Sequence, residues 1–338
     1  MALRVDLQGS FLPLFPRFSR LLGLFCLTLS LWAFQRSESF PETTISNGLI
    51  TAKLYVPDAQ RGYYRAERFD WSGVITDLQY QGHSFFGPWF DTHDPKVNDA
   101  ITGPVEEFVA IGYAAAKPGE TFLKIGVGAL RKKDTTAYRF YHSYENINPG
   151  HWTTRVSKDQ VTFVHELSDA AGYSYHYEKT VRLLPNKPVL VLEHRLKNTG
   201  TKTIETNVYN HNFFVLDRQP TGPDCRVTFP FDLQTQGETQ GLGTLAAVEG
   251  NTWRFLKELE PGESTQVFLT GFGTTAKDYH LRVENKSVGV NVTGDQPLTR
   301  IVCWAKRTTF CPELYIPVKA EPGKEFRWNI QYTFFTKE

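Results

Sequence analysis

From residue 40 to the end of the chain, hydrophobic and polar side chains alternate in short segments that are separated by Gly, Pro, Asn and Asp. A two-residue alternation is typical of β-strands that bury one face, and segments with a helical period and helix caps are almost absent. The pattern therefore predicts an all-β protein. The segments with the strongest strand character are residues 161–165, 173–181, 189–196, 203–208, 265–270, 288–292 and 326–335.

The boundaries between these segments carry residues that favour tight turns. Leu-Pro-Asn-Lys-Pro occupies residues 184–188, Asn-Thr-Gly residues 198–200 and Glu-Pro-Gly-Lys residues 321–324. Such short connections join neighbouring antiparallel strands. No low-complexity linker or shift in composition divides residues 40–338, so we expect one domain, built as a large antiparallel β-sandwich.

The N-terminal segment, residues 1–39, differs from the rest of the chain. Arg4, Arg17 and Arg20 precede an uncharged apolar run over residues 21–34. This layout is typical of a secretory signal peptide, and a run of roughly 14 residues is shorter than the roughly 20 that span a bilayer. We expect an exported protein, periplasmic or secreted, whose mature chain begins between Phe34 and Glu42. An uncleaved segment that tethers the protein to a membrane is the alternative.

The charge balance argues against polyanionic partners. The chain has 37 Lys and Arg and 36 Asp and Glu, of which residues 1–39 hold four and two, so residues 40–338 carry 33 and 34. They contain no basic stripe and no aromatic-plus-Arg motif, so nucleic-acid binding is not expected. No segment indicates an obligatory protein partner.

Three of the four cysteines, Cys225, Cys303 and Cys311, lie beyond the N-terminal segment. None has the spacing of a metal site, and no two histidines share a metal-ligand spacing, so we expect no metal. Cys303 and Cys311 flank the polar residues 306–309 between two strand-like runs. We expect a hairpin in which they form a disulfide or lie as buried neighbours on adjacent strands, with Cys225 reduced.

The segment richest in candidate chemistry is residues 190–217, LVLEHRLKNTGTKTIETNVYNHNFFVLD, which predicts a hairpin followed by a polar cluster. Its Asn210-His211-Asn212-Phe213-Phe214 motif resembles the Asn-His-x-(Tyr/Phe)-Phe segment of the aldose 1-epimerase (galactose mutarotase) superfamily. Two further segments are similar to that family. Residues 311–335, CPELYIPVKAEPGKEFRWNIQYTFF, place a glutamate before a Pro-Gly turn and a final strand, and residues 73–83 resemble the early β-hairpin.

This resemblance implies a galactose mutarotase-like supersandwich that performs acid/base chemistry on a carbohydrate without a metal or organic cofactor. It implies His211 as the proton donor to the ring oxygen and Glu313 as the base at the anomeric hydroxyl. Asp217 would orient sugar hydroxyls, and Asn210 is a further candidate sugar ligand. The residue types suit these roles, because histidine titrates near neutral pH and a partly desolvated glutamate has its pKa raised toward the same range.

One region departs from the pattern of the family, which usually carries another histidine and an Asn-Arg pair in an early loop. Here residues 98–108 read NDAITGPVEEF. His93 and Arg68 are the nearest substitutes, and Glu106 and Glu107 are candidates for a different sugar contact. The alternative for this acidic pair is one solvated and one capping side chain. The departure indicates a substrate other than simple galactose or glucose.

Aromatic residues make up 14% of the chain, and sugar C–H faces stack on aromatic rings. Most of these residues are expected to fill the core, because aromatic side chains favour strands and pack sandwiches. Trp71, Trp89 and Trp152 are different, since they lie beside polar residues in predicted loops. We expect at least one of them at the rim of a sugar site.

Three functions remain open at this point: an aldose 1-epimerase-like isomerase, a non-catalytic carbohydrate-binding module, and a polysaccharide lyase or glycoside hydrolase on the same sandwich. A hydrolase needs two carboxyl groups across the scissile bond, which Glu313 with Glu106 or Glu107 would supply. The pairing of His211 with Glu313 favours ring opening instead. No Arg or Lys cluster suited to phosphate is evident, so a neutral mono- or oligosaccharide is expected.

Overall fold

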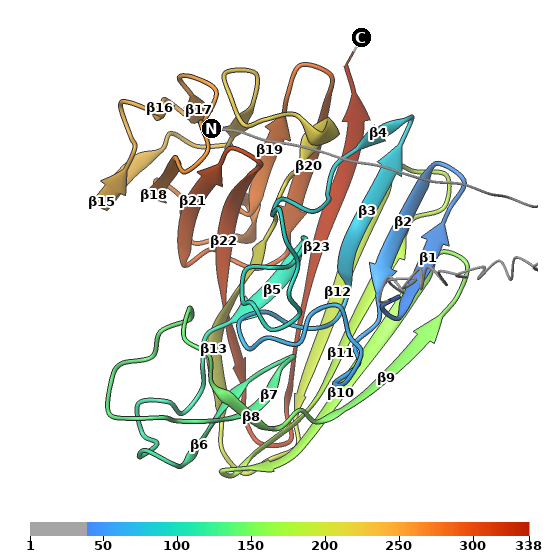
Figure 1. Ribbon diagram of the computed structural model, residues 1–338, viewed down its shortest axis with the longest axis vertical. Helices are drawn as coiled ribbons and strands as arrows, with labels where there is room; N and C mark the ends of the chain where they lie inside the picture. Colours follow the sequence, from blue (N-terminus) through green and yellow to red (C-terminus); the bar gives the residue numbers. More distant parts are fainter. Residues whose placement is uncertain (1–38, 338) are drawn as a thin grey trace, which may run out of the picture. The chain divides into compact units, whose positions relative to one another are not determined.

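Antiparallel strands make up about half of residues 39–337, which are the residues that the computed structural model describes (Figure 1). Each segment predicted as a strand matches one; residues 173–181, for example, fall within β11 (Tyr173–Leu183). The all-β class is confirmed. The expectations for the export segment fall on residues 1–38, which lie outside the described part. Within residues 39–337, no helix has the length and hydrophobicity to cross a membrane.

The largest sheet has ten strands, and the strands that were clearest in the sequence lie at its centre. Each neighbouring pair is antiparallel, as the short turns predict. In order across the sheet the strands are β16 (Ala246–Glu249), β17 (Thr252–Phe255), β14 (Arg226–Thr228), β19 (His280–Glu284), β20 (Val288–Gly294), β23 (Glu325–Thr336), β12 (Val189–Asn198), β11, β10 (Gln160–Ala170) and β9 (His151–Val156).

A second sheet of six antiparallel strands carries the residues of greatest chemical interest. The middle of this sheet is the hairpin of two strands around residues 306–309, next to the strand that contains the Asn-His motif. In order across the sheet its strands are β15 (Gln234–Gln240), β18 (Ser264–Thr270), β21 (Arg300–Lys306), β22 (Thr309–Ala320), β13 (Ile204–His211) and β5 (Val105–Phe108).

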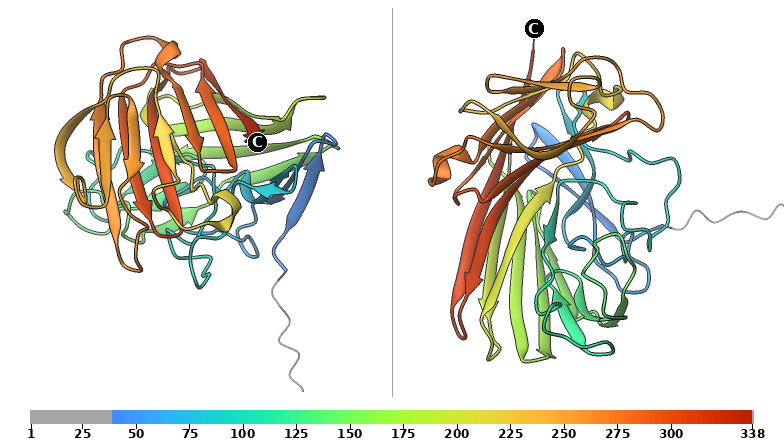
Figure 2. Two further views of the ribbon diagram at one scale, coloured as in Figure 1. Left: turned by 90° about the horizontal axis from the view of Figure 1, so that it is seen from above. Right: turned by 90° about the vertical axis from the view of Figure 1, so that its left-hand side faces the viewer.

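Two small sheets and two short 3₁₀ helices complete the described part of the chain. The right-hand view of Figure 2 shows the blue to green loops of the first half of the chain gathered on one side of the long strands. The four-stranded sheet contains β1 (Glu42–Ser46), β2 (Ile50–Tyr55), β3 (Val74–Tyr80) and β4 (His83–Ser84); the three-stranded sheet contains β6 (Thr121–Lys124), β7 (Gly128–Arg131) and β8 (Glu145–Asn148); the helices are η1 (Leu216–Arg218) and η2 (Ala276–Asp278).

The two large sheets share one hydrophobic core, which confirms the predicted sandwich. Leu192 and Tyr332 of the ten-stranded sheet belong to the same buried cluster as Val208 and Ile316 of the six-stranded sheet. Burial alternates along β11 as it does along the sequence, with every second side chain from Tyr175 onward buried. The hydrophobic effect of this shared core holds the sheets face to face.

The cysteine hairpin is present, without a disulfide. Cys303 lies on β21 and Cys311 on the adjacent β22, and both thiols are free and buried, as is Cys225. Cys303 pairs in register with Pro312 and Cys311 with Trp304, so the two cysteines belong to opposite faces of the sheet. The expectation of buried neighbours on adjacent strands is confirmed, and the opposite faces explain why the two sulfur atoms are not bonded.

A fully buried ion cluster links the two large sheets. Glu106 of β5 forms ion pairs with Lys179 of β11 and with Nε2 of His194 on β12, the latter at 2.9 Å. All three side chains are buried, and Asn210 of β13 donates a further hydrogen bond to Glu106 at 2.9 Å. Burial opposes ionisation of Glu106, but Lys179 and His194 outweigh it and hold the pKa of that carboxyl below its usual range.

We expect this cluster to matter far more for stability than an ion pair on the surface. The Lys179→Met variant leaves Glu106 with a weakened set of partners in the core, so we expect a loss of about 3–5 kcal/mol in the free energy of unfolding. Lys53 provides the control, because its ion pair with Glu42 is more than 40% exposed on both sides. Lys53→Met should cost at most about 1 kcal/mol. Urea unfolding followed by tryptophan fluorescence measures both, and similar losses would contradict the assignment.

Candidate active site

The six-stranded sheet presents two different faces, because alternate residues of a strand point to opposite sides. Val208 and Ile316 face the core, whereas their neighbours Tyr209 and Tyr315 line a pocket of about 580 Å³. This volume is typical of a small-molecule site. The pocket is lined by Arg68, Trp89, Asp99, Glu107, Val109, Tyr138, Phe140, Tyr209, His211, Phe213, Gln266, Phe268, Arg300, Val302, Trp304, Lys306, Glu313 and Tyr315.

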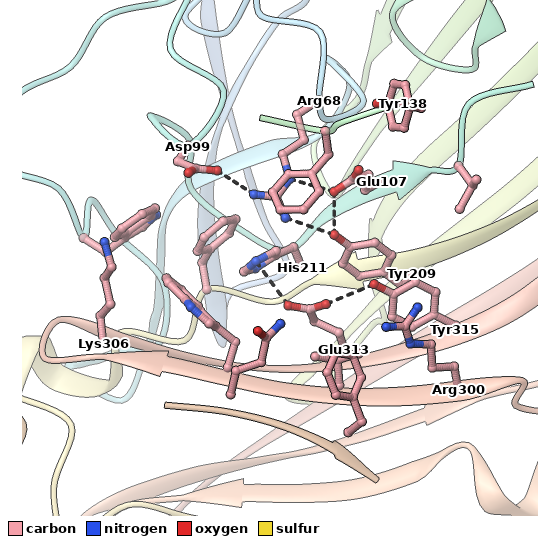
Figure 3. Close-up of a pocket in the computed structure, with 18 residues that line it drawn as sticks. Arg68, Asp99, Glu107, Tyr138, Tyr209, His211, Arg300, Lys306, Glu313 and Tyr315 are labelled. Atoms are coloured by element: carbon pink, nitrogen blue, oxygen red, sulfur yellow. Dashed lines mark hydrogen bonds and ion pairs between the residues drawn. The ribbon is translucent and has the colours of Figure 1, made fainter. Parts of the chain in front are cut away.

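His211 and Glu313 meet in the wall of this pocket (Figure 3). Nε2 of His211, at the end of β13, lies 3.3 Å from Oε1 of Glu313 on β22. The second carboxyl oxygen of Glu313 accepts a hydrogen bond of 3.2 Å from the hydroxyl of Tyr315. The side chains of His211 and Glu313 are only 4% and 7% exposed, so water has little access to the contact.

Burial sets the protonation of this pair. It raises the pKa of Glu313 to about 8, with Arg68 opposing the shift and Glu107 adding to it. Burial also holds the pKa of His211 well below its usual range, and the positive charge of Arg68 acts in the same direction. At pH 7 the ligand-free pair therefore holds one proton, and this proton lies on the carboxyl group.

The ring of His211 is oriented by stacking on an aromatic side chain. Its centroid lies 3.8 Å from that of Phe213, and Phe213 in turn stacks on Trp89 with centroids 5.2 Å apart. The rings of Phe69 and Trp304 contact the His211 ring in T-shaped arrangements, with centroids 5.5 and 5.6 Å from that of His211. The buried Nδ1 atom of His211 has no hydrogen-bond partner. Aromatic contacts, rather than a hydrogen bond from a third residue, hold the imidazole in place.

The Asn-His-x-Phe-Phe motif explains how this stack forms. Nδ2 of Asn212 donates to the carbonyl oxygen of Pro312 at 2.6 Å, and its Oδ1 accepts from the hydroxyl of Tyr332 at 2.8 Å. The chain then turns through the left-handed region at Phe213, where φ is 43°. The two hydrogen bonds anchor the end of β13 on β22 and β23, and the turn places the Phe213 ring against His211.

Arg68 forms the opposite wall of the pocket and is bound to acidic neighbours (Figure 3). Its guanidinium contacts Asp99 at 2.6 Å and Glu107 at 2.7 Å, and donates to the hydroxyl of Tyr209 at 3.2 Å. Glu107 also lies 3.5 Å from the buried Nζ of Lys124. Burial alone would raise the pKa of Glu107, but Arg68 and Lys124 outweigh it and hold the pKa below its usual range.

No protein-family model matches this sequence, and no curated protein sequence matches it significantly. Its structure, in contrast, is similar to solved structures over most of its length. A galactose mutarotase-like protein from Clostridium acetobutylicum superposes with a TM-score of 0.55 at 13% identity, over 88% of this chain and 95% of that one. The fold is that of the galactose mutarotase-like proteins.

Two further structures support this assignment of the fold. The Slr1438 protein from Synechocystis sp. PCC 6803 has a TM-score of 0.54 at 13% identity, over 88% of this chain and 97% of that one. The GalM/aldose epimerase homologue from C. elegans has a TM-score of 0.52 at 16% identity, over 89% and 99%. The resemblance seen in the sequence motifs therefore holds for the mutarotase-like fold, and the chemistry depends on this chain's own residues.

The structure brings some of the predicted site residues together. His211, Glu313, Arg68, Glu107 and Trp89 all line the pocket. Arg68 and Trp89 come from loops in the first part of the chain. The sequence alone did not show that these loops lie beside two strands from its second half.

Other predicted residues lie elsewhere. Asp217 of η1 accepts hydrogen bonds from the backbone N–H of Ser84 at 3.0 Å and contacts Nδ1 of His83 at 2.9 Å, so it fastens η1 to β4. Asn210 and Glu106 belong to the buried ion cluster, because they occupy the core side of β13 and β5. None of these three side chains lines the pocket.

The remaining aromatic candidates serve packing. The indole N–H of Trp71 donates to the carbonyl oxygen of Ala66 at 2.9 Å inside a second buried cluster. Trp152 stacks on His165 with centroids 4.1 Å apart, and His93, the proposed substitute for the family's early histidine, stacks on Tyr63 at 3.9 Å. These three rings are outside the pocket lining.

Several pocket residues were not predicted from the sequence. Tyr209 and Tyr315 each lie two positions from a predicted residue on the same strand, so the two-residue period of a strand would have identified them. Arg300, Trp304 and Lys306 required the pairing of β21 with β22, in which Val302 is opposite Glu313. Within residues 39–337, no group of three or more His, Cys, Asp or Glu side chains is arranged to hold a metal ion.

The raised pKa of Glu313 is directly testable. We expect its carboxyl ¹³C resonance to titrate near pH 8 in the ligand-free protein, so that the group is protonated at pH 7. Carbon-detected NMR of protein with ¹³C-labelled glutamate measures the shift, and the Glu313→Gln variant identifies the signal by its loss. Titration of that signal near pH 4 to 5 would show that water reaches the pair and would contradict the dry environment described above.

Proposed function

We propose that this protein is an aldose 1-epimerase-like isomerase that opens and recloses the hemiacetal ring of a sugar, with His211 and Glu313 as its acid/base pair. The observation that carries the proposal is the buried contact of 3.3 Å between the imidazole and the carboxyl group in the wall of a pocket. The fold shared with galactose mutarotase-like proteins supports a carbohydrate as the substrate.

Ring opening requires one proton to arrive and one to leave. In the proposed step, His211 as imidazolium gives its proton to the ring oxygen while the Glu313 carboxylate takes the proton of the C1 hydroxyl. The bond between C1 and the ring oxygen breaks, its electron pair stays on that oxygen, and C1 becomes an aldehyde. Rotation about the C1–C2 bond and the reverse proton transfers close the ring with the opposite configuration at C1.

The protonation of the pair fits this cycle. After ring opening, His211 is neutral and Glu313 is protonated, which is the state that burial favours in the ligand-free pocket. Before ring opening the same proton must lie on His211, and the 3.3 Å contact gives it a direct path. Sugar hydroxyl groups that donate hydrogen bonds to Glu313 stabilise its carboxylate form and so favour this transfer. The pair holds one proton at both stages.

The arrangement around Glu107 argues against a glycoside hydrolase. Such an enzyme needs a second carboxyl group that is free to act as an acid, a base or a nucleophile. The carboxylate of Glu107 is already bound by Arg68, Lys124 and Tyr209. These partners stabilise its charge and occupy its oxygen atoms. The remaining carboxyl group of the lining, that of Asp99, is paired with Arg68 at 2.6 Å, so the lining offers Glu313 no second free carboxyl group.

We further propose that the protein acts outside the cytoplasm. This proposal rests on the basic and apolar pattern of the N-terminal segment, with Arg4, Arg17 and Arg20 ahead of an uncharged run. An exported isomerase of this kind would act on sugars before their uptake.

Removing either member of the pair should abolish most of the activity. Glu313→Gln keeps the shape and removes the base, and His211→Asn keeps a hydrogen-bonding group and removes the titratable one. We expect each variant to lose roughly a hundred- to ten-thousand-fold in rate, the usual effect of one positioned proton-transfer group. The double variant should be about as inactive as the single ones, because the two residues act as a unit. Polarimetry on freshly dissolved α-anomers measures the rate.

Asp217→Asn provides the matched control, because this carboxylate lies outside the pocket and should leave the rate within about threefold. Calorimetry shows whether the variants still bind a sugar. Wild-type protein that binds sugars without accelerating mutarotation would support the binding module instead, and cleavage of an oligosaccharide would support the lyase or hydrolase.

The pH dependence should reflect the shifted pKa values of the free protein. As the pH rises through about 8, Glu313 loses the single proton of the pair, so kcat/KM should fall. As the pH falls, the pair gains a second proton on His211. This happens only well below pH 6.5, the usual pKa of histidine, because the pKa of His211 is lowered. We therefore expect a plateau from pH 6.5 to about 7 and roughly half of that value near pH 8, measured by polarimetry after subtraction of the spontaneous rate. A maximum near pH 5.5, midway between the usual values of 4.5 and 6.5, would contradict this assignment.

A further inference from the structure

The pocket contains two cations that the protein leaves without an acidic partner. Arg68, in the same pocket, is neutralised by Asp99 and Glu107. The side chains of Arg300 and Lys306, in contrast, are exposed and form no hydrogen bond or ion pair with any of residues 39–337, although both line the pocket. With Glu313 protonated, the lining therefore carries uncompensated positive charge, which attracts an anion.

Arg300 is held in place by two aromatic rings. Its guanidinium carbon lies 4.7 Å from the centroid of Phe268 and 5.3 Å from that of Tyr315. Stacking on these rings uses the faces of the planar group and leaves its N–H edges free for an acceptor in the plane. A guanidinium fixed in this way loses little conformational entropy when it binds an anion.

The register of the hairpin places Arg300 beside the acid/base pair. Val302 lies opposite Glu313. Arg300, two residues before Val302 and on the same face of the strand, lies opposite Tyr315. Along the strand, Arg300 is thus roughly 7 Å from Val302, whereas Lys306 is roughly 13 Å away in the other direction. Figure 3 shows Arg300 and Lys306 on opposite sides of the pair. Arg300 is within reach of the far side of one sugar ring whose anomeric carbon lies at Glu313.

From this placement, and resting on the proposed function, we propose that the substrate is an acidic sugar of the uronic acid class, whose carboxylate binds the guanidinium of Arg300. The two N–H groups of one edge match the two oxygens of a carboxylate. A neutral sugar, which the sequence alone favoured, would offer this exposed, stacked cation no negative charge.

The single charge of Arg300 favours a carboxylate over a phosphate ester. A phosphate group carries close to two negative charges at neutral pH and is usually bound by several cations. Lys306 cannot join Arg300 on one phosphate, because the two residues lie at opposite ends of β21, roughly 20 Å apart. Arg68 is also engaged, since Asp99 and Glu107 bind it.

The test compares two sugars that differ only at C6. Freshly dissolved α-D-galacturonate and α-D-galactose are followed by polarimetry at pH 7, and the ratio of their kcat/KM values is the specificity. We expect the wild-type protein to favour galacturonate by at least tenfold. Arg300→Met should lower this ratio by roughly ten- to a hundred-fold, the usual effect of one charge-assisted hydrogen-bonded contact. Because the ratio cancels any change common to both sugars, an indirect effect on Glu313 does not alter it.

Two further variants separate charge from geometry. Arg300→Lys keeps the charge but loses the planar fork, so we expect a ratio between those of the wild type and Arg300→Met. Lys306→Met removes a cation from the same strand face on the other side of the pair, and its ratio should stay within about threefold of the wild type. An equal loss in Lys306→Met and Arg300→Met would overturn the assignment of the carboxylate to Arg300.

The outcomes distinguish this inference from the proposed function. Mutarotation of galactose with no preference for galacturonate, unchanged in Arg300→Met, would overturn the inference alone. A preference for galactose 6-phosphate over galacturonate that depends on Arg300 would overturn the choice of a carboxylate. If no sugar is mutarotated, the proposed function fails, and calorimetric titration of galacturonate into the wild type and Arg300→Met still decides the ligand class: tighter binding to the wild type supports it, and equal or absent binding overturns it.

Discussion

Two adjacent carboxylates on β5 organise this structure. Because neighbouring residues of a strand point to opposite faces, Glu106 enters the core between the sheets and Glu107 enters the pocket. Each is buried and bound by cations, Glu106 by Lys179 and Glu107 by Arg68 and Lys124. A buried carboxylate without such partners would be costly, so the ten-stranded sheet and the loop that carries Arg68 must both be in place around this one short strand.

The pocket depends on the same arrangement. Arg68 is held against Glu107 and Tyr209, and from there its charge reaches His211 and Glu313. It opposes protonation of the imidazole and limits the rise in the pKa of the carboxyl group, while burial has the larger effect on both. Burial and the positive charge of Arg68 together determine whether the single proton of the pair lies on His211 or on Glu313. Arg68, which forms one wall of the pocket, therefore also shifts the pKa of both members of the pair.

The sequence predicted the parts of this molecule in which local and tertiary preferences agree. Alternation identified the long central strands, and turn residues identified their connections. It missed β15, whose side chains are all exposed because the strand lies at the edge of a sheet, and it gave no sign of β5, where two glutamates occupy a buried strand. Ion pairs between distant segments make that burial possible, and no local pattern reveals them.

The order of the motifs was sufficient to predict that His211 and Glu313 share one pocket, but Asp217 and Asn210 show the limit of this reasoning. Both lie close in sequence to His211, and neither lines the pocket, since Asn210 points to the opposite face and Asp217 fastens a turn. Arg300 was not identified for a different reason: the role proposed for it follows from strand register and from the lack of an ion pair between its side chain and any described residue, which are properties of the folded chain.

The pocket face of β21 and β22 also restricts which insertions and deletions the hairpin between them can accept. Residues 300, 302, 304 and 306 face the pocket together with Glu313 and Tyr315, while Ile301, Cys303 and Leu314 face the core. If one residue were inserted or deleted within either strand, every residue after that position would face the opposite side, so core residues would face the pocket and pocket residues the core. Only a β-bulge at that position would prevent this exchange. Leu314 would then replace Glu313 in the pocket, and a charged group would enter the core. Variation in chain length that preserves function should therefore be confined to the turn or occur in steps of two residues.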